Sequence, residues 1–248
     1  MSTEKTEGLV IRLADFSETS KVATLFTRDF GKISAMAKGA RRLKSAFEAA
    51  LDLLAASSIV FIRKSSDSLD LLTEAQLTFR FRPKSRDMTV LYGGYYVAEL
   101  LNSLTEEYDP HPELYDETLH VLNHLQEGSN PKLSLLRYEL IVLREIGQLP
   151  DLEICTICGE RAAGDQQFAY WHSQSGLICS NCQTKEYSQR RISAGTIAIL
   201  RRLAAEDSQL LNRLNVSEQQ MREMRPLVTS AICGVLGRRP KMMRYLQM

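Results

Sequence analysis

The sequence has no apolar run of the kind that crosses a membrane or forms a secretory leader. Its first residues, MSTEKTEG, are polar and carry charges of both signs, and no apolar signal-peptide core follows them. The most apolar long stretch, Leu91 to Leu104, is interrupted by Glu99 and Asn102, and it is shorter than the roughly 18 apolar residues that a membrane helix needs. We therefore expect a cytoplasmic protein.

Motifs of the common catalytic and nucleotide-binding sites are also missing. The sequence has no G-x-x-x-x-G-K-[ST] phosphate loop, no G-x-G-x-x-G after a predicted strand and no G-x-S-x-G nucleophile turn. No Cys/His pair or pair of acids stands out as a catalytic group. These absences argue against ATP-driven work and favour a binding protein over an enzyme.

The chain has almost no net charge, +1, but its charges are unevenly distributed. Residues 1–86 carry a net charge of +5, residues 87–132 of −8, residues 133–189 of −3 and residues 190–248 of +7. Basic ends around an acidic middle indicate at least two electrostatically distinct surfaces, or else ordinary solvated helix faces.

Residues 7–82 have the pattern of a small β-domain. Short stretches in which apolar residues alternate are separated by turn residues, and they cover residues 8–16, 21–30, 32–38, 58–63 and 69–79. Between the third and fourth stretches, the Ala- and Leu-rich segment Ala46 to Ala56 predicts one short helix. Five short strands with a helix between the third and fourth are the arrangement of an OB-fold barrel.

Beyond Asp87 the apolar residues follow a helical period. It predicts helices over residues 89–104, 114–125, 133–146, 193–204 and 217–237, and a short one from Pro240. Gly147 is placed to cap the third helix, and Ser217 with Gln220 forms a capping box. We predict an α+β multidomain chain with an OB-fold nucleic-acid-binding domain at 1–82, followed by an all-α domain in two parts, 83–149 and 188–248, and a four-cysteine zinc-binding segment at 150–187.

Four of the five cysteines form two Cys-x-x-Cys pairs, Cys155 with Cys158 and Cys179 with Cys182. Two residues between cysteines let both thiolates face one ion, and Gly159 permits the positive-φ turn that such a knuckle often needs. Four thiolates complete a tetrahedral shell around zinc and leave no position for water or substrate. The pattern predicts one structural zinc ion.

Three other interpretations of these cysteines stay open. Disulfides are disfavoured in a cytosolic chain, and a thioredoxin-like redox pair needs a single motif in a βαβ setting. An iron–sulfur cluster uses the same kind of ligand. Cys233, among apolar residues, is interpreted as a buried small side chain.

Clustered cations indicate a phosphate-binding surface. Lys38, Arg41, Arg42 and Lys44 surround Gly39 on a loop after the third predicted strand. Arg28 and Lys32 flank the preceding turn, and Arg80, Arg82 and Lys84 alternate at the end of the predicted barrel. Phe30, Phe79 and Phe81 could stack on bases or fill the barrel core.

Several stretches resemble the RecO recombination mediator family. They are ETS (Glu18–Ser20), LFTRDFGKI (Leu25–Ile33), AKGARRLKS (Ala37–Ser45), YGGYYVAELL (Tyr92–Leu101), LLRYELIVLREIGQLPDLEICTICG (Leu135–Gly159) and LGRRPKMMRYL (Leu236–Leu246). The likeness runs through nearly the whole chain in order. Two departures exist: Leu-Asp-Leu-Leu follows Ala50, where a proline and an aromatic are common in the family, and some family members lack the cysteines.

The resemblance implies a nucleoid-associated mediator of DNA repair and homologous recombination. Such proteins bind single- and double-stranded DNA, anneal strands without ATP, and help load RecA onto DNA coated by the single-stranded-DNA-binding protein SSB, usually with RecR. Arg137, Tyr138 and Arg144 match the region that would bind the SSB C-terminal tail, although helix packing explains them equally well. The alternatives are a zinc-ribbon transcription or translation factor and a nucleic-acid-modifying enzyme.

Overall fold

The computed structural model describes residues 2–43, 45–47, 49–64, 68–84, 86–128, 130–162, 167–171, 176–185, 191–205 and 214–246. The chain forms two compact units, Met1–Pro131 with Lys241–Gln247 and Lys132–Pro240. The sequence division at residue 82 follows the change from strands to helices, whereas the contacts divide the chain after Pro131. The predicted four-segment division stays a prediction.

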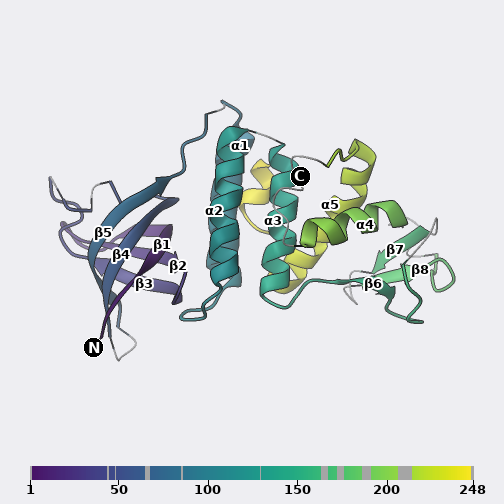
Figure 1. Ribbon diagram of the computed structural model, residues 1–248, viewed down its shortest axis with the longest axis horizontal. Coiled ribbons are helices and arrows are strands. Elements are labelled where there is room, and N and C mark those ends of the chain that lie inside the picture. Colours follow the sequence, from purple (N-terminus) through teal and green to yellow (C-terminus); the bar gives the residue numbers. More distant parts are fainter. Residues whose placement is uncertain are drawn as a thin grey trace. The chain divides into compact units, whose positions relative to one another are not determined.

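The first unit begins with a closed five-stranded barrel (Figure 1). Its strands are β1 (Ser2–Asp15), β2 (Lys21–Thr27), β3 (Gly31–Ala37), β4 (Ala55–Arg63) and β5 (Asp70–Arg80). They close in the order β1-β2-β3-β5-β4, and only the β3–β5 pairing is parallel. This order confirms the predicted OB-fold.

β1 is long because it pairs along two different stretches of its length. Ser2–Leu9 pair with β4 and Gly8–Asp15 pair with β2, and the pairing with β2 has a register shift between Val10 and Arg12. A bulge of this kind bends a strand, which allows the sheet to close on itself. The polar start of β1 was not predicted as a strand because it lacks apolar alternation.

The predicted helix over Ala46 to Ala56 is wrong for the described part of that segment, which forms turns before β4 begins at Ala55. Phe47 and Leu51 are buried in the barrel core, and Leu54 has a φ of 63°, which an α-helix does not tolerate. The described residues of this segment therefore form turns that bury Phe47 and Leu51 in the barrel core instead of a helix.

Two helices and a short C-terminal turn complete the first unit. They are α1 (Met88–Leu104), α2 (Pro112–Glu127) and the 3-10 helix η3 (Met242–Tyr245). The backbone N–H groups of Lys241 and Met242 donate to the Glu99 carboxylate on α1 at 2.7 and 2.8 Å. The last described residues of the chain are thus attached to the first unit.

The second unit packs three helices against a small sheet. Its helices are α3 (Pro131–Glu145), α4 (Ala194–Ala204) and α5 (Glu218–Leu236), and its strands are β6 (Asp151–Cys155), β7 (Gln167–Trp171), β8 (Gly176–Cys179) and β9 (Arg191–Ser193). The sheet order is β6-β8-β7-β9. The caps predicted at Gly147 and at Ser217 with Gln220 are confirmed.

No helix among the described residues is both long enough and apolar enough to span a membrane.

Candidate metal centre and nucleic-acid surface

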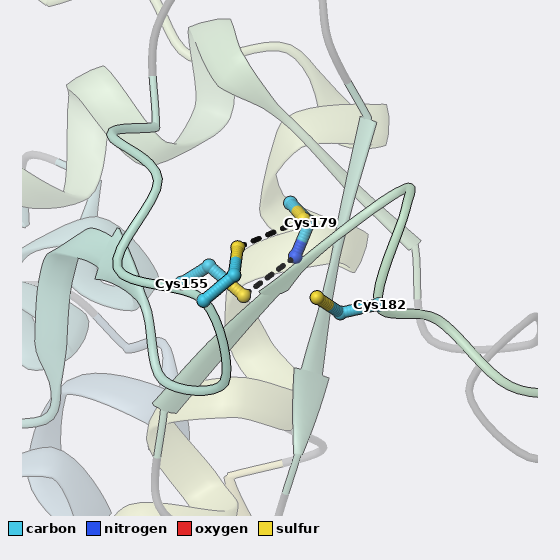
Figure 2. Close-up of side chains that lie close together, drawn as sticks. Cys155, Cys179 and Cys182 are labelled. Atoms are coloured by element: carbon cyan, nitrogen blue, oxygen red, sulfur yellow. Dashed lines mark hydrogen bonds between the residues drawn. The ribbon is translucent and has the colours of Figure 1, made fainter.

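The two cysteine pairs come together in the second unit. Cys155 ends β6 and Cys179 ends β8, and each strand runs directly into a tight turn that carries the second cysteine of its pair. All four Sγ atoms lie within 4.8 Å of one another, and the Sγ atoms of Cys158 and Cys179 are 3.6 Å apart. Figure 2 shows Cys155, Cys179 and Cys182 converging on one point.

Backbone hydrogen bonds fix both turns. The N–H of Gly159 donates to the Cys155 carbonyl at 2.9 Å, and Gly159 has the positive φ, 74°, that the sequence predicted. The N–H groups of Cys182 and Gln183 donate to the Cys179 carbonyl, both at 3.1 Å. These backbone hydrogen bonds therefore fix the path of both turns that carry the cysteines.

The thiols differ in acidity. Burial raises the pKa of Cys155, but hydrogen bonds from the backbone of Cys179, Cys158 and Ile157 outweigh burial and lower that pKa to about 6. Burial raises the pKa of Cys179, and the hydrogen bond with Cys158 raises that of Cys182 to about 12. Four thiols so close together all ionise only beside a compensating cation, because each negative charge raises the pKa of the next.

The arrangement fits a tetrahedral metal ion. Zinc–sulfur bonds of about 2.3 Å place the corners of a tetrahedron about 3.8 Å apart. The 3.6 Å separation of Cys158 and Cys179 is close to that edge, and the other separations stay within 4.8 Å. The four cysteines can thus hold one metal ion, although thiolate donors suit both zinc and iron.

Arg201 on α4 supports the first cysteine turn, a role that was not predicted from the sequence. Its Nε donates to the Leu152 carbonyl at 2.8 Å, its Nη2 donates to the Ala162 carbonyl at 3.2 Å, and it pairs with Glu153 at 3.1 Å. These groups flank Cys155 on both sides of the turn. The basic last turn of a predicted helix was the one available signal, and it does not identify the partners.

The predicted basic loop follows β3 and precedes the turns that lead into β4. Lys38, Arg41 and Arg42, the cations of this loop that the structure describes, are exposed, and Lys44 lies outside the described residues. Arg41 donates to the Ser17 carbonyl at 2.8 Å and pairs with Asp15 at 3.6 Å, so the basic loop is tied to the turn between β1 and β2. Gly39 has a φ of 76°, and the Arg42 N–H donates to its carbonyl.

Three other predicted cations are exposed at the surface of the first unit. Arg28 forms two hydrogen bonds with Asp116, which raise its pKa, and Lys84 pairs with Glu127 at 2.7 Å. Arg82 is exposed too. Exposed ion pairs contribute little to stability, so such cations can exchange a carboxylate for a phosphate.

Lys32 and Arg80 are used inside the fold. The Lys32 ammonium donates to the carbonyls of Asn102 and Thr105 at the end of α1, and burial lowers its pKa. Arg80 donates to the Ala49 carbonyl at 2.8 Å. Both side chains are engaged with backbone groups of the first unit and are only partly exposed, unlike Lys38 and Arg42.

The phenylalanines considered for base stacking mainly serve the core. Phe30 packs edge-on against Phe61 with ring centres 5.4 Å apart, and Phe81 is buried. Phe79 is half-buried. Packing therefore describes both rings better than base stacking does, Phe30 against the barrel core and Phe81 beside Gly94 of α1.

The residues predicted to bind the SSB tail lie on α3. Arg137 and Tyr138 are only 3% and 1% exposed. Arg144 donates to the Ala204 carbonyl at 2.6 Å and to Glu145 at 2.9 and 3.1 Å. A role of these residues in partner binding stays a prediction, and in the structure their side chains serve the packing of the second unit.

Comparison with known proteins identifies relatives over most of the chain. The family model for the recombination protein O N terminal matches residues 1–81, and the model for the recombination protein O C terminal matches residues 85–244. A DNA repair protein RecO from Rhodopirellula baltica is 42% identical over 200 residues, which are 80% of this chain and 74% of the relative. Relatives with the same name from Bacillus pumilus and Listeria monocytogenes are 32% and 30% identical, cover 90% and 87% of this chain, and are themselves covered to 86% and 83%.

Proposed function

Because this chain belongs to the RecO family of DNA repair and recombination proteins, we propose that it is a non-catalytic mediator that binds and anneals DNA strands. It would bind both single- and double-stranded DNA, work without ATP in the cytoplasm at the nucleoid, and help RecR load RecA onto SSB-coated strands. The absence of a phosphate-loop motif supports the independence from ATP.

The observation that carries this proposal is the exposed basic loop at one end of the barrel. Lys38 and Arg42 present their cations to solvent, and Arg41 fixes the loop against the β1–β2 turn. Phosphate contacts from such cations position a strand without reading its sequence, which suits a protein that must anneal any complementary pair. Arg28, Arg82 and Lys84 would extend the contact.

We also propose that Cys155, Cys158, Cys179 and Cys182 hold one structural zinc ion. The ion would supply a closed, tetrahedral cross-link between the ends of β6 and β8, with no open position for substrate. Family members without these cysteines indicate that such an ion serves the fold of the second unit, not the shared activity.

The partner contacts belong to the same proposal. An acidic, apolar-ended SSB tail needs an apolar surface rimmed by cations. Arg144, near the end of α3, is half-buried and is more exposed than Arg137 and Tyr138. Use of Arg137 or Tyr138 would require neighbouring side chains to move aside.

An annealing assay tests the proposed function. Complementary oligonucleotides, bare or coated with SSB, are mixed with the protein without ATP, and duplex formation is followed over time. We expect acceleration that weakens steeply as salt rises, because binding to phosphates releases counterions. No acceleration at low salt would defeat the proposal.

Charge reversal locates the surface. The pair Lys38→Glu with Arg42→Glu should abolish most of the acceleration, whereas Arg222→Glu, at an exposed site on α5, should leave it unchanged. Arg41 is spared because its contacts hold the loop. Sequence-selective binding would instead favour a zinc-ribbon factor, and a covalently altered strand would indicate an enzyme.

A further inference from the structure

The turn between β1 and β2 presents an exposed aromatic ring. Phe16 is 59% exposed and directly follows the exposed end of β1, whose buried residues are Thr6 and Gly8–Ile11. Its backbone is well fixed, because the N–H groups of Phe16 and Ser17 donate to the Ser20 carbonyl at 3.0 and 3.3 Å. The Ser20 N–H in turn donates to the Ser17 hydroxyl at 3.2 Å.

The same turn is attached to the basic loop. Arg41 reaches it three times, through its backbone N–H to the Thr19 carbonyl at 3.1 Å, its guanidinium to the Ser17 carbonyl and its ion pair with Asp15. The ion pair also offsets the carboxylate next to Phe16, which would otherwise repel a phosphate. An exposed ring and exposed cations are therefore held on two neighbouring loops.

We propose that Phe16 stacks on a base of single-stranded DNA while Lys38 and Arg42 contact the adjacent phosphates. This inference rests on the proposed function and deepens it, since it assigns the residue that favours single strands. Bases in a duplex are already stacked on one another, so an exposed ring has a partner only where a strand is unpaired. Cationic grooves with aromatic side chains are the usual platform for sequence-tolerant single-strand binding.

The two kinds of contact respond differently to salt, which makes the assignment testable. Stacking on one base contributes about 1–3 kcal/mol, or roughly a 5- to 150-fold change in affinity, without releasing counterions. A phosphate contact changes the slope of log affinity against log salt by about 0.7 on a single strand. Loss of the ring should therefore lower the affinity equally at all salt concentrations. Loss of a cation should reduce the slope of log affinity against log salt.

The experiment measures binding of a labelled oligothymidine and of a labelled duplex by fluorescence anisotropy at several salt concentrations. Phe16→Leu should weaken oligothymidine binding about 5- to 150-fold, with an unchanged salt slope and unchanged duplex binding. Phe16→Tyr, which keeps an aromatic ring, should bind oligothymidine like the wild type. Arg42→Ala should lower the slope. Leu43→Ala, which trims a fully exposed apolar side chain on the basic loop, should bind like the wild type.

The outcomes separate this inference from the proposed function. If the wild type binds oligothymidine and Phe16→Leu binds it equally well, the inference fails and the proposed function stands. Equal weakening on single strand and duplex would also overturn it, because the residue would then only support the loop. If the wild type binds neither DNA, the proposed function itself is lost.

Discussion

Lys32 and Lys38 stand at the two ends of β3, and their ammonium groups lie in different surroundings. Lys32 is half-buried. Its ammonium caps the end of α1 by donating hydrogen bonds to the carbonyls of Asn102 and Thr105. Lys38 is exposed. Cations at a helix C-terminus interact favourably with its unpaired carbonyls, so Lys32 stabilises the fold while Lys38 is available to a ligand.

Lys32→Ala and Lys38→Ala should therefore behave oppositely. Lys32→Ala should lower the free energy of unfolding by about 1–3 kcal/mol, since it removes two charged hydrogen bonds, and it should leave the salt slope of DNA binding unchanged. Lys38→Ala should change stability by less than about 0.5 kcal/mol and reduce the slope by about 0.7. Urea unfolding followed by circular dichroism and anisotropy titrations measure the two quantities. A reduced salt slope of DNA binding in Lys32→Ala would show that Lys32 contacts DNA.

The partners of several predicted cations lie far along the chain, so the sequence alone does not show which cations are paired. Arg28 pairs with Asp116 and Lys84 pairs with Glu127, and both carboxylates belong to α2, far along the chain. The basic loop was recognisable because its four cations lie within seven residues, Lys38 to Lys44. Phe16 was not singled out because a phenylalanine at the end of an apolar strand usually packs inside.

At the scale of elements, α1 approaches the barrel closely at a glycine. An added Cβ at Gly94 would lie 2.5 Å from a ring carbon of Phe81 and 2.8 Å from a methyl group of Leu54. Both neighbours are buried and belong to the backbone segments that close the barrel end. The helix therefore depends on the missing side chain for its distance from the barrel.

Gly94→Ala should destabilise the first unit by about 1–3 kcal/mol, because the added methyl group overpacks a filled core. The control is Gly234→Ala on α5, where no atom lies within 4 Å of the added Cβ and alanine favours the helix by up to about 1 kcal/mol. Urea unfolding of both variants measures the difference. A Gly94→Ala protein as stable as the wild type would show that α1 can shift outward at little cost.

Elements were predictable where a periodic apolar pattern decides the structure. The five barrel strands and the helices α1 to α5 follow such patterns, and caps at Gly147 and Ser217 follow known local chemistry. The Ala46–Ala56 segment was misjudged because composition alone does not show that Phe47 and Leu51 turn into the barrel. The strands β6 to β9 were missed because strands of three to five residues depend on the cysteine turns and on packing against α3 and α4.

At the scale of the whole molecule, the four-cysteine cluster and the basic loop belong to different units. The second unit has its own core, in which Cys155 and Cys179 are buried with Leu136, Phe168 and Leu200. The basic loop packs within the first unit. Loss of the proposed metal ion should therefore disrupt the second unit and spare the first.

Cys182→Ser should lose the metal ion and the structure around β6 to β9, while the barrel keeps its affinity for oligothymidine. A closed zinc site contributes on the order of 10 kcal/mol to folding in small zinc peptides, so its loss should be evident. Metal analysis reports the metal content, and anisotropy titrations report the affinity for oligothymidine. The structure around the sheet is followed by the fluorescence of the single tryptophan, Trp171 at the end of β7. Cys233→Ser, which changes a half-buried cysteine outside the cluster, is the matched control. Iron in the wild type, or DNA binding lost together with the metal, would contradict this assignment.

The attachment of Lys241 and Met242 to Glu99 has a consequence for the order in which the protein is completed during synthesis. The ribosome makes the whole of the second unit between α2 and this attachment, so the second unit can finish folding first. The barrel and its two helices, although translated earlier, receive their last piece only when Lys241–Tyr245 have emerged. A released chain truncated before Lys241 should therefore contain the whole second unit and a first unit that lacks its last piece.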